Sequence, residues 1–175
     1  MDFYDADGLN LGLFVLRVVV GLTLAAHGLA KVRSGLENVG RWFDSEGLRP
    51  GRMHATAAAS VETGGGVLLA LGLLTPLAAM ALVGNMTVAG FIGHRKNGFF
   101  IIRNGWEFTM VLATIAAVLA ATGPGEWSLD NAIGLEWNGV AWFVVAAVGG
   151  VAAAVAFLAA FYRPVPAPRE AEAEA

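Results

Sequence analysis

A long apolar stretch near the N-terminus, residues 9–32, constrains this chain more than any other feature. About 22 mostly apolar residues are enough to cross a hydrocarbon layer of about 30 Å at about 1.5 Å per residue. Arg17 lies inside the apolar body, and His27 and Lys31 lie at its end. On a helix, Arg17 and Lys31 share one face with Gly21 and Gly28, while the rest of the surface is aliphatic or aromatic. This pattern is typical of a membrane-spanning helix with one face against protein and the other against lipid.

The composition supports a membrane protein. Hydrophobic residues make up 57% of the 175 residues and charged residues only 14%, whereas soluble domains carry about 25% charged residues. The absence of cysteine excludes disulfides, thiolate nucleophiles and iron–sulfur ligation by this chain. The residues before the apolar stretch are acidic and include no Lys or Arg, so we expect a retained segment rather than a cleavable signal peptide. No pattern indicates a metal site or nucleic-acid binding.

Five apolar segments are long enough to span a membrane, which predicts an all-α, polytopic helical bundle. The segments are residues 9–30, 54–74, 76–93, 106–122 and 140–162. The second and third are separated only by Thr75 and Pro76, and a proline-broken turn this short predicts an antiparallel helical hairpin.

The basic residues divide sharply between the two sides of this five-span bundle. Ten of the 11 Lys and Arg fall in loops or the tail on one side, and the remaining one is Arg17. The positive-inside rule then predicts an N-terminus outside and a C-terminus in the cytoplasm. We also expect a short interfacial helix at residues 36–43 and a disordered Pro/Ala/Glu-rich tail at residues 164–175.

Three polar residues lie inside the predicted spans. Glu62 shares its helical face with small residues, and Arg17 lies at a depth from which its long side chain could reach the carboxylate. Asn85 lies at the depth of Arg17 and could close a network with both. Two interpretations remain open: a structural ion pair that holds the helices in register, or a polar site for a ligand or proton.

A second polar group is expected at the cytoplasmic rim, and its members are His27, Lys31, His94, Trp106 and Glu107. They could anchor the protein at lipid headgroups, or they could bind a quinone or another amphipathic ligand; quinone carbonyls need donors and a proton source. Haem ligation by His27 and His94 would need facing imidazoles, and only their common depth supports it. His54 begins the second span and is expected at the surface.

Several short motifs resemble the DoxX family of small bacterial membrane proteins. They cover residues 10 to 131 and comprise Leu16-Arg17, His27-Gly28-Leu29-Ala30-Lys31, Gly47-Leu48, Glu62-Thr63-Gly64-Gly65, Leu71-Gly72-Leu73-Leu74-Thr75-Pro76, Asn104-Gly105-Trp106-Glu107-Phe108 and Gly123-Pro124-Gly125 with Ser128-Leu129-Asp130. The resemblance implies a four-helix membrane core at residues 1–131, located in the cytoplasmic (inner) membrane of a bacterium. Residues 132–163, with a fifth span, depart from that core.

The resemblance also implies a function, because some members of the family are subunits of thiosulfate:quinone oxidoreductases and others accompany redox proteins in oxidant or thiol stress. We therefore expect a membrane subunit of a quinone-linked redox complex, with a quinone as possible cofactor and a redox protein or a second copy as possible partner. One alternative is a structural or assembly scaffold without chemistry, and another is a small-solute transporter lined by Arg17, Glu62 and Asn85.

Overall fold

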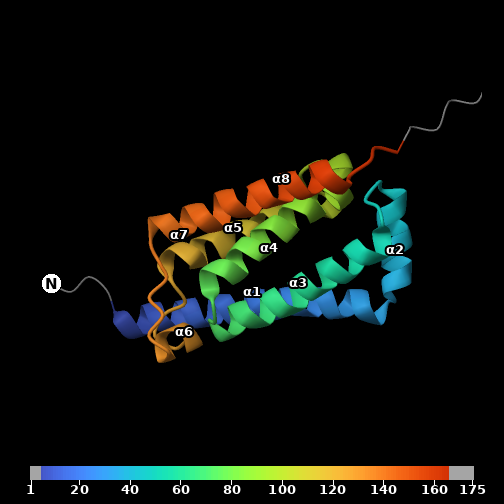
Figure 1. Ribbon diagram of the computed structural model, residues 1–175. Helices are drawn as coiled ribbons and strands as arrows, with labels where there is room; N and C mark the ends of the chain where they lie inside the picture. Colours follow the sequence, from blue (N-terminus) through green and yellow to red (C-terminus); the bar gives the residue numbers. More distant parts are fainter. Residues whose placement is uncertain (1–4, 166–175) are drawn as a thin grey trace, which may run out of the picture.

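The computed structural model describes residues 5–165, and within this range the chain is built of helices joined by short connections (Figure 1). The α-helices are α1 Ala6–Arg33, α2 Leu36–Ser45, α3 Gly51–Leu71, α4 Thr75–Ala89, α5 Glu107–Thr122, α6 Leu129–Ala132, α7 Val140–Val144 and α8 Gly150–Phe161. Single π- or 3-10-helical turns follow α4, precede α5 and join α7 to α8, namely η1 Gly90–His94, η2 Arg95–Asn97, η3 Ile101–Arg103 and η4 Val145–Gly149. The predicted all-α membrane bundle is confirmed.

Three helical stretches are long and apolar enough to cross a membrane, namely Ala6–Arg33, Thr75–Asn97 and Val140–Phe161. α5 is apolar but has 16 residues, just below the usual minimum of about 17. α3 has 21 residues but carries His54 and Glu62 within it. Each predicted span thus coincides with a helix, and α2 coincides with the predicted interfacial helix. The predicted tail falls almost entirely on residues 166–175, outside the described part of the chain.

The hairpin between α3 and α4 forms, but its turn precedes the predicted break at Thr75 and Pro76. α3 ends at Leu71 and is capped by Gly72, which adopts a left-handed conformation with φ +63°, as glycine readily does at a helix C-terminus. Pro76 lies in the first turn of α4, where its missing N–H costs no helical hydrogen bond. The buried carboxylate of Asp130 satisfies this end of α4 by accepting from the backbone N–H of Leu74 (2.7 Å) and Thr75 (2.9 Å).

α1 and α3 pack closely against each other along a seam of small residues, and they form one layer of the bundle (Figure 1). Gly21 of α1 lies directly against the backbone of Gly66 and Ala70 of α3. About two helical turns further along α1, Gly28 lies against Ala59 and Thr63 of α3. A side chain at either glycine would meet the backbone of the facing helix, so these contacts fix the antiparallel register of α1 and α3.

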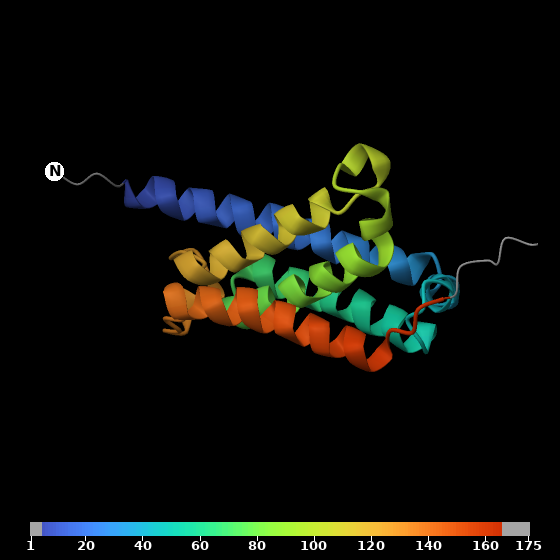
Figure 2. The same cartoon turned by 90° about the horizontal axis from the view of Figure 1, so that it is seen from above.

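α4, α5 and α8 form the second layer, and α4 lies between α3 and α8 (Figures 1 and 2). α8 approaches α4 where Gly150 meets Met80 and Val83. The end of α8 is tied to the loop between α2 and α3, because the Arg163 N–H donates to the carbonyl oxygen of Gly47 (2.7 Å). The last helix is therefore attached at one end to a loop from the first third of the chain.

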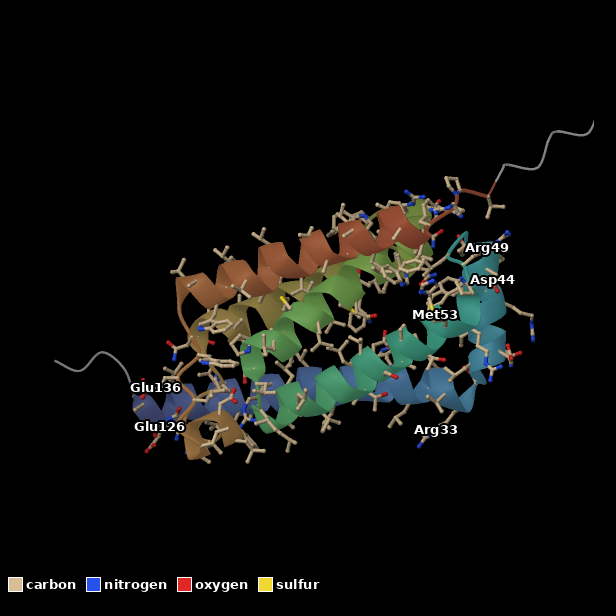
Figure 3. All side chains as sticks on the ribbon, viewed as in Figure 1. Arg33, Asp44, Arg49, Met53, Glu126 and Glu136 are labelled. Atoms are coloured by element: carbon tan, nitrogen blue, oxygen red, sulfur yellow. The ribbon has the colours of Figure 1, made fainter. Side chains whose placement is uncertain are left out.

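The two ends of the bundle carry opposite charge. Figure 3 shows Arg33 and Arg49 near α2 at one end, and Glu126 and Glu136 in the connections around α6 at the other. The first and last described residues also lie at opposite ends (Figure 1). This arrangement is the one expected for an odd number of spans.

Candidate functional site

A cavity of about 450 Å³ lies between α3 on one side and α4 and α8 on the other, toward the end of the bundle that carries α2. Its walls are mostly apolar and include the rings of Trp42, Phe43 and Phe157. Five side chains bring polar groups to it, namely Lys31, His54, Glu62, Asn85 and His94. An apolar enclosure with a few convergent polar groups is the usual form of a small-molecule site.

The centre of the polar group is Glu62, whose residue surface is only 3% exposed. One carboxylate oxygen of Glu62 accepts a hydrogen bond from Lys31 Nζ, and the other accepts from Asn85 Nδ2 (3.1 Å). Lys31 comes from α1, Glu62 from α3 and Asn85 from α4. The three side chains therefore join both layers of the bundle through one ion pair and one amide.

Arg17 is not part of this network, and the predicted pairing of Arg17 with Glu62 is wrong. The Arg17 guanidinium donates to the carbonyl oxygens of Ala70 and Trp127 instead. It is almost fully buried, near the acidic end of the bundle, where the negative charge of Asp130 also attracts it. Arg17 thus holds the end of α3 to the loop that follows α5.

The reason lies in the register of α1 and α3. Gly21 faces Gly66 and Ala70, so Arg17, one turn earlier, reaches the end of α3 rather than its middle. Residues near the end of α1 face the middle of α3 for the same reason, which brings Lys31 to Glu62. Ala70, the partner of Arg17, lies eight residues beyond Glu62, which is about 12 Å along α3 and too far for one guanidinium to bridge.

The rim residues do not converge on one site. His27 is exposed and packs beside Phe108, with ring centroids 6.1 Å apart. The Glu107 carboxylate accepts a hydrogen bond from the Ile101 N–H (2.9 Å) and so stabilises the connection that precedes α5. Trp106 packs edge-on against Phe99, outside the cavity.

Of the predicted rim group, only Lys31 and His94 line the cavity. His94 Nδ1 donates to the carbonyl oxygen of Asn104 (2.9 Å). In the neutral form this leaves Nε2 of His94 as a hydrogen-bond acceptor. Lys31 and Asn85 therefore provide donors to the cavity, and His94 is suited to accept a proton or a hydroxyl hydrogen.

His54, expected at the surface, is buried with 2% of its surface exposed. Its ring lies edge-on to Phe157 and Phe161 of α8, at centroid distances of 5.0 and 4.8 Å. The spacing from His54 through Ala58 and Val61 to Glu62 follows one helical face, so this pattern could have assigned His54 to the interior. The contact with α8 itself leaves no such signal in the sequence.

Comparison with known proteins agrees with the helical membrane bundle. The family model described as DoxX matches residues 12–95. An uncharacterized protein of Haemophilus influenzae is 34% identical over 122 residues, which cover 68% of this chain and 88% of that protein. The chain belongs to the DoxX family. Its similarity to the Escherichia coli inner membrane protein YqjF is 24% identity over 73% of this chain and 96% of YqjF.

A third relative is the uncharacterized membrane protein Rv3486 of Mycobacterium tuberculosis, which is 28% identical over 66% of this chain and 77% of that protein. No solved structure matches the chain. The part matched by the DoxX family model extends from α1 to η2. It therefore contains all five polar residues of the cavity, whereas α5 and α8 lie beyond it.

Proposed function

We propose that this DoxX family protein binds a quinone headgroup in the cavity and acts as a membrane subunit of a quinone-linked redox complex. The observation that carries the proposal is the position of the ion pair of Lys31 and Glu62 at the wall of an apolar cavity. A volume of about 450 Å³ falls in the range of about 300–1,000 Å³ typical of small-molecule sites.

The lining chemistry suits the two halves of an isoprenoid quinone. Quinone carbonyls accept hydrogen bonds, which Lys31 Nζ and the Asn85 amide could donate. The hydroxyl of the reduced form could donate to His94 Nε2. The aromatic side chains Trp42 and Phe157 provide flat apolar surfaces for the ring.

The proposed route to the cavity is from the bilayer. Ala57 of α3, Ala81 of α4 and Ala153 of α8 line the cavity and are exposed. Small apolar side chains at an exposed rim leave space for an isoprenoid tail to remain in lipid while the headgroup lies inside. A water-soluble ligand would gain nothing from such a rim, which favours a membrane-dissolved ligand.

The chain has no cysteine, so in this proposal a partner protein carries out any sulfur chemistry and supplies or removes electrons. The proposal also keeps the predicted orientation, with the basic end in the cytoplasm. Purification in mild detergent, followed by identification of co-purified lipids and proteins, tests this part. A bound quinone with an oxidoreductase partner supports it, and reproducible purification without either contradicts it.

Quinone binding itself can be followed by tryptophan fluorescence, because Trp42 lines the cavity and quinones quench indole emission on contact. We expect saturable quenching by decylubiquinone in the wild-type protein, and loss of the saturable part in Trp42→Phe. The double variant Lys31→Met with Glu62→Leu removes the polar group without leaving a buried lone charge, and it should bind at least about tenfold more weakly. Glu107→Gln, outside the cavity, serves as the matched control and should bind as the wild type does.

A scaffold without a ligand is the second candidate, and one observation favours it: the pair of Lys31 and Glu62 also joins α1 to α3. A scaffold predicts that the double variant loses stability while no quinone quenches Trp42 in a saturable manner. The same experiment therefore separates the two functions.

A further inference from the structure

His54 is a buried polar side chain whose burial the fold alone does not explain. It is 2% exposed, and its Nε2 has no hydrogen-bond partner among residues 5–165. Burying a hydrogen-bonding nitrogen without a partner is unfavourable, and the few such groups in native proteins call for an explanation, of which a functional role is one. The imidazole also lines the proposed quinone cavity.

The ring neighbours of His54 hold its plane but satisfy no polar atom. Phe157 and Phe161 lie one helical turn apart on α8, and both meet the imidazole edge-on or near edge-on. Phe157 lines the cavity and Phe161 does not. α8 therefore packs against the side of His54 that faces away from α3. A ligand in the cavity could then provide the hydrogen-bond partner of Nε2.

His54 is also well separated from the other polar groups of the cavity. It lies eight residues before Glu62 on α3, which corresponds to about 12 Å along the helix at about 1.5 Å per residue. A quinone carries its two carbonyls on opposite sides of one ring, so it needs hydrogen-bond donors on both sides. Lys31 and Asn85 both bond to the Glu62 carboxylate, so they mark the far end of this interval, which is of the order needed for one ring with a hydrogen bond of about 3 Å at each end.

We propose that His54 is a headgroup-binding residue of this cavity. Its Nε2–H donates to one quinone carbonyl, while Lys31 or Asn85 donates to the other. Phe157 and Phe161 of α8 are positioning residues for the His54 ring. This inference rests on the proposed quinone binding and adds a role for α8. The polar residues of the site all lie within the part matched by the family model. The helix α8 lies beyond that part, and in this proposal it completes the site by positioning His54.

The test compares decylubiquinone binding, measured by quenching of Trp42, across four variants of the full chain in detergent. His54→Phe keeps an aromatic ring and removes the donor, and we expect roughly five- to tenfold weaker binding. His54→Gln keeps an amide donor and should retain part of the lost affinity. Phe161→Leu removes one clamp without changing the cavity lining, and it should weaken binding by roughly two- to fivefold.

His27→Phe is the matched control, since it makes the same substitution at an exposed histidine outside the cavity, and it should bind like the wild type. Circular dichroism melting of each variant shows whether a loss of binding follows a loss of fold. Folded His54→Phe that binds as tightly as the wild type overturns this inference and leaves quinone binding standing. If the wild-type protein shows no saturable quenching, both proposals fail together. Should His54→Phe not fold, unchanged binding by His54→Gln and Phe161→Leu together would overturn the inference.

Discussion

At the scale of single residues, Glu62 shows how a charge can be accommodated inside a membrane bundle. The carboxylate is almost fully buried but has a cationic partner and an amide partner, each from a different helix. The Lys31 side chain is 25% exposed at the rim of the bundle. The two members of the pair are therefore unequal, because Lys31 can reach water without Glu62, whereas Glu62 cannot without Lys31.

This inequality predicts different effects for the two single substitutions. Lys31→Met leaves a buried carboxylate without a cation, and we expect a loss of about 3–5 kcal/mol in the free energy of unfolding. Glu62→Leu leaves a lysine that can turn toward water, so its effect should be smaller. In the double variant the loss should be less than the sum of the two. Thermal unfolding in detergent, analysed as a double-mutant cycle, measures the coupling.

The exposed pair of Arg52 and Glu37 provides the control for that cycle. Their charged atoms lie 2.9 Å apart, but the side chains are 72% and 60% exposed. Water screens such a pair, so its coupling should be at most about 1 kcal/mol. Equal coupling energies for the two pairs would contradict the buried role of Glu62.

A second prediction at this scale concerns Arg17. Arg17→Met leaves the part-buried carbonyl oxygens of Ala70 and Trp127 without their donor, and we expect a loss of about 1–3 kcal/mol in the free energy of unfolding. Arg33→Met, at an exposed position on the same helix, should change stability little. Because Arg17 is remote from the cavity, its substitution should not alter Trp42 quenching once unfolded protein is removed; a specific effect on quenching would link the two ends of the bundle.

At the scale of elements, the seam between α1 and α3 decides which polar side chains meet. The small-residue face of α3 around Glu62 was recognisable in the sequence, and it correctly indicated close packing against another helix. The register was not recognisable, because α1 and α3 each carry several small residues and more than one alignment places glycine against small side chains. Arg17 and Lys31 both lie on the seam face of α1, so the register alone chose Lys31 as the partner of Glu62.

The seam predicts opposite effects for two alanine substitutions only two residues apart. A Cβ at Gly66 would lie 2.5 Å from the Gly21 carbonyl oxygen, whereas a Cβ at Gly64 would meet nothing within 4 Å. Gly66→Ala should therefore push α1 away and destabilise the fold by about 1–3 kcal/mol. Gly64→Ala should be neutral or stabilising by up to about 1 kcal/mol through helix propensity. Melting temperatures of the two variants that move in the same direction would contradict this packing.

At the scale of the whole molecule, the sequence predicted the helical segments but not the cavity. Long apolar runs and the proline near residue 76 marked the segments because those signals are local. The cavity depends on how α3 diverges from α4 and on where α8 packs, and these are contacts between residues far apart in the chain. His94 and Lys31 were correctly grouped by depth, but depth could not show that His27 and Glu107 point elsewhere.

The charge difference between the two ends carries the orientation proposal and gives a further prediction. A reporter that is active only in the cytoplasm should be active when fused after Ala175, which follows the basic end of the bundle. The same reporter placed ahead of Met1 should be inactive, because the chain enters α1 from the acidic end (Figures 1 and 3). The reverse pattern would place the cavity and its polar group toward the outer face of the membrane.

The attachment of α8 to Gly47 also has a consequence for the synthesis and membrane insertion of the protein. Chains emerge from the ribosome N-terminus first, so Lys31, Glu62 and Asn85 are in the membrane before α8 exists. During that interval the cavity lacks the wall that α8 provides. A molecule dissolved in the bilayer can then enter through that open side rather than through the alanine-lined rim. Docking of α8 then encloses whatever is present, as the carbonyl oxygen of Gly47 receives the Arg163 N–H. A newly made chain can thus leave the insertion machinery with a molecule from the bilayer already enclosed.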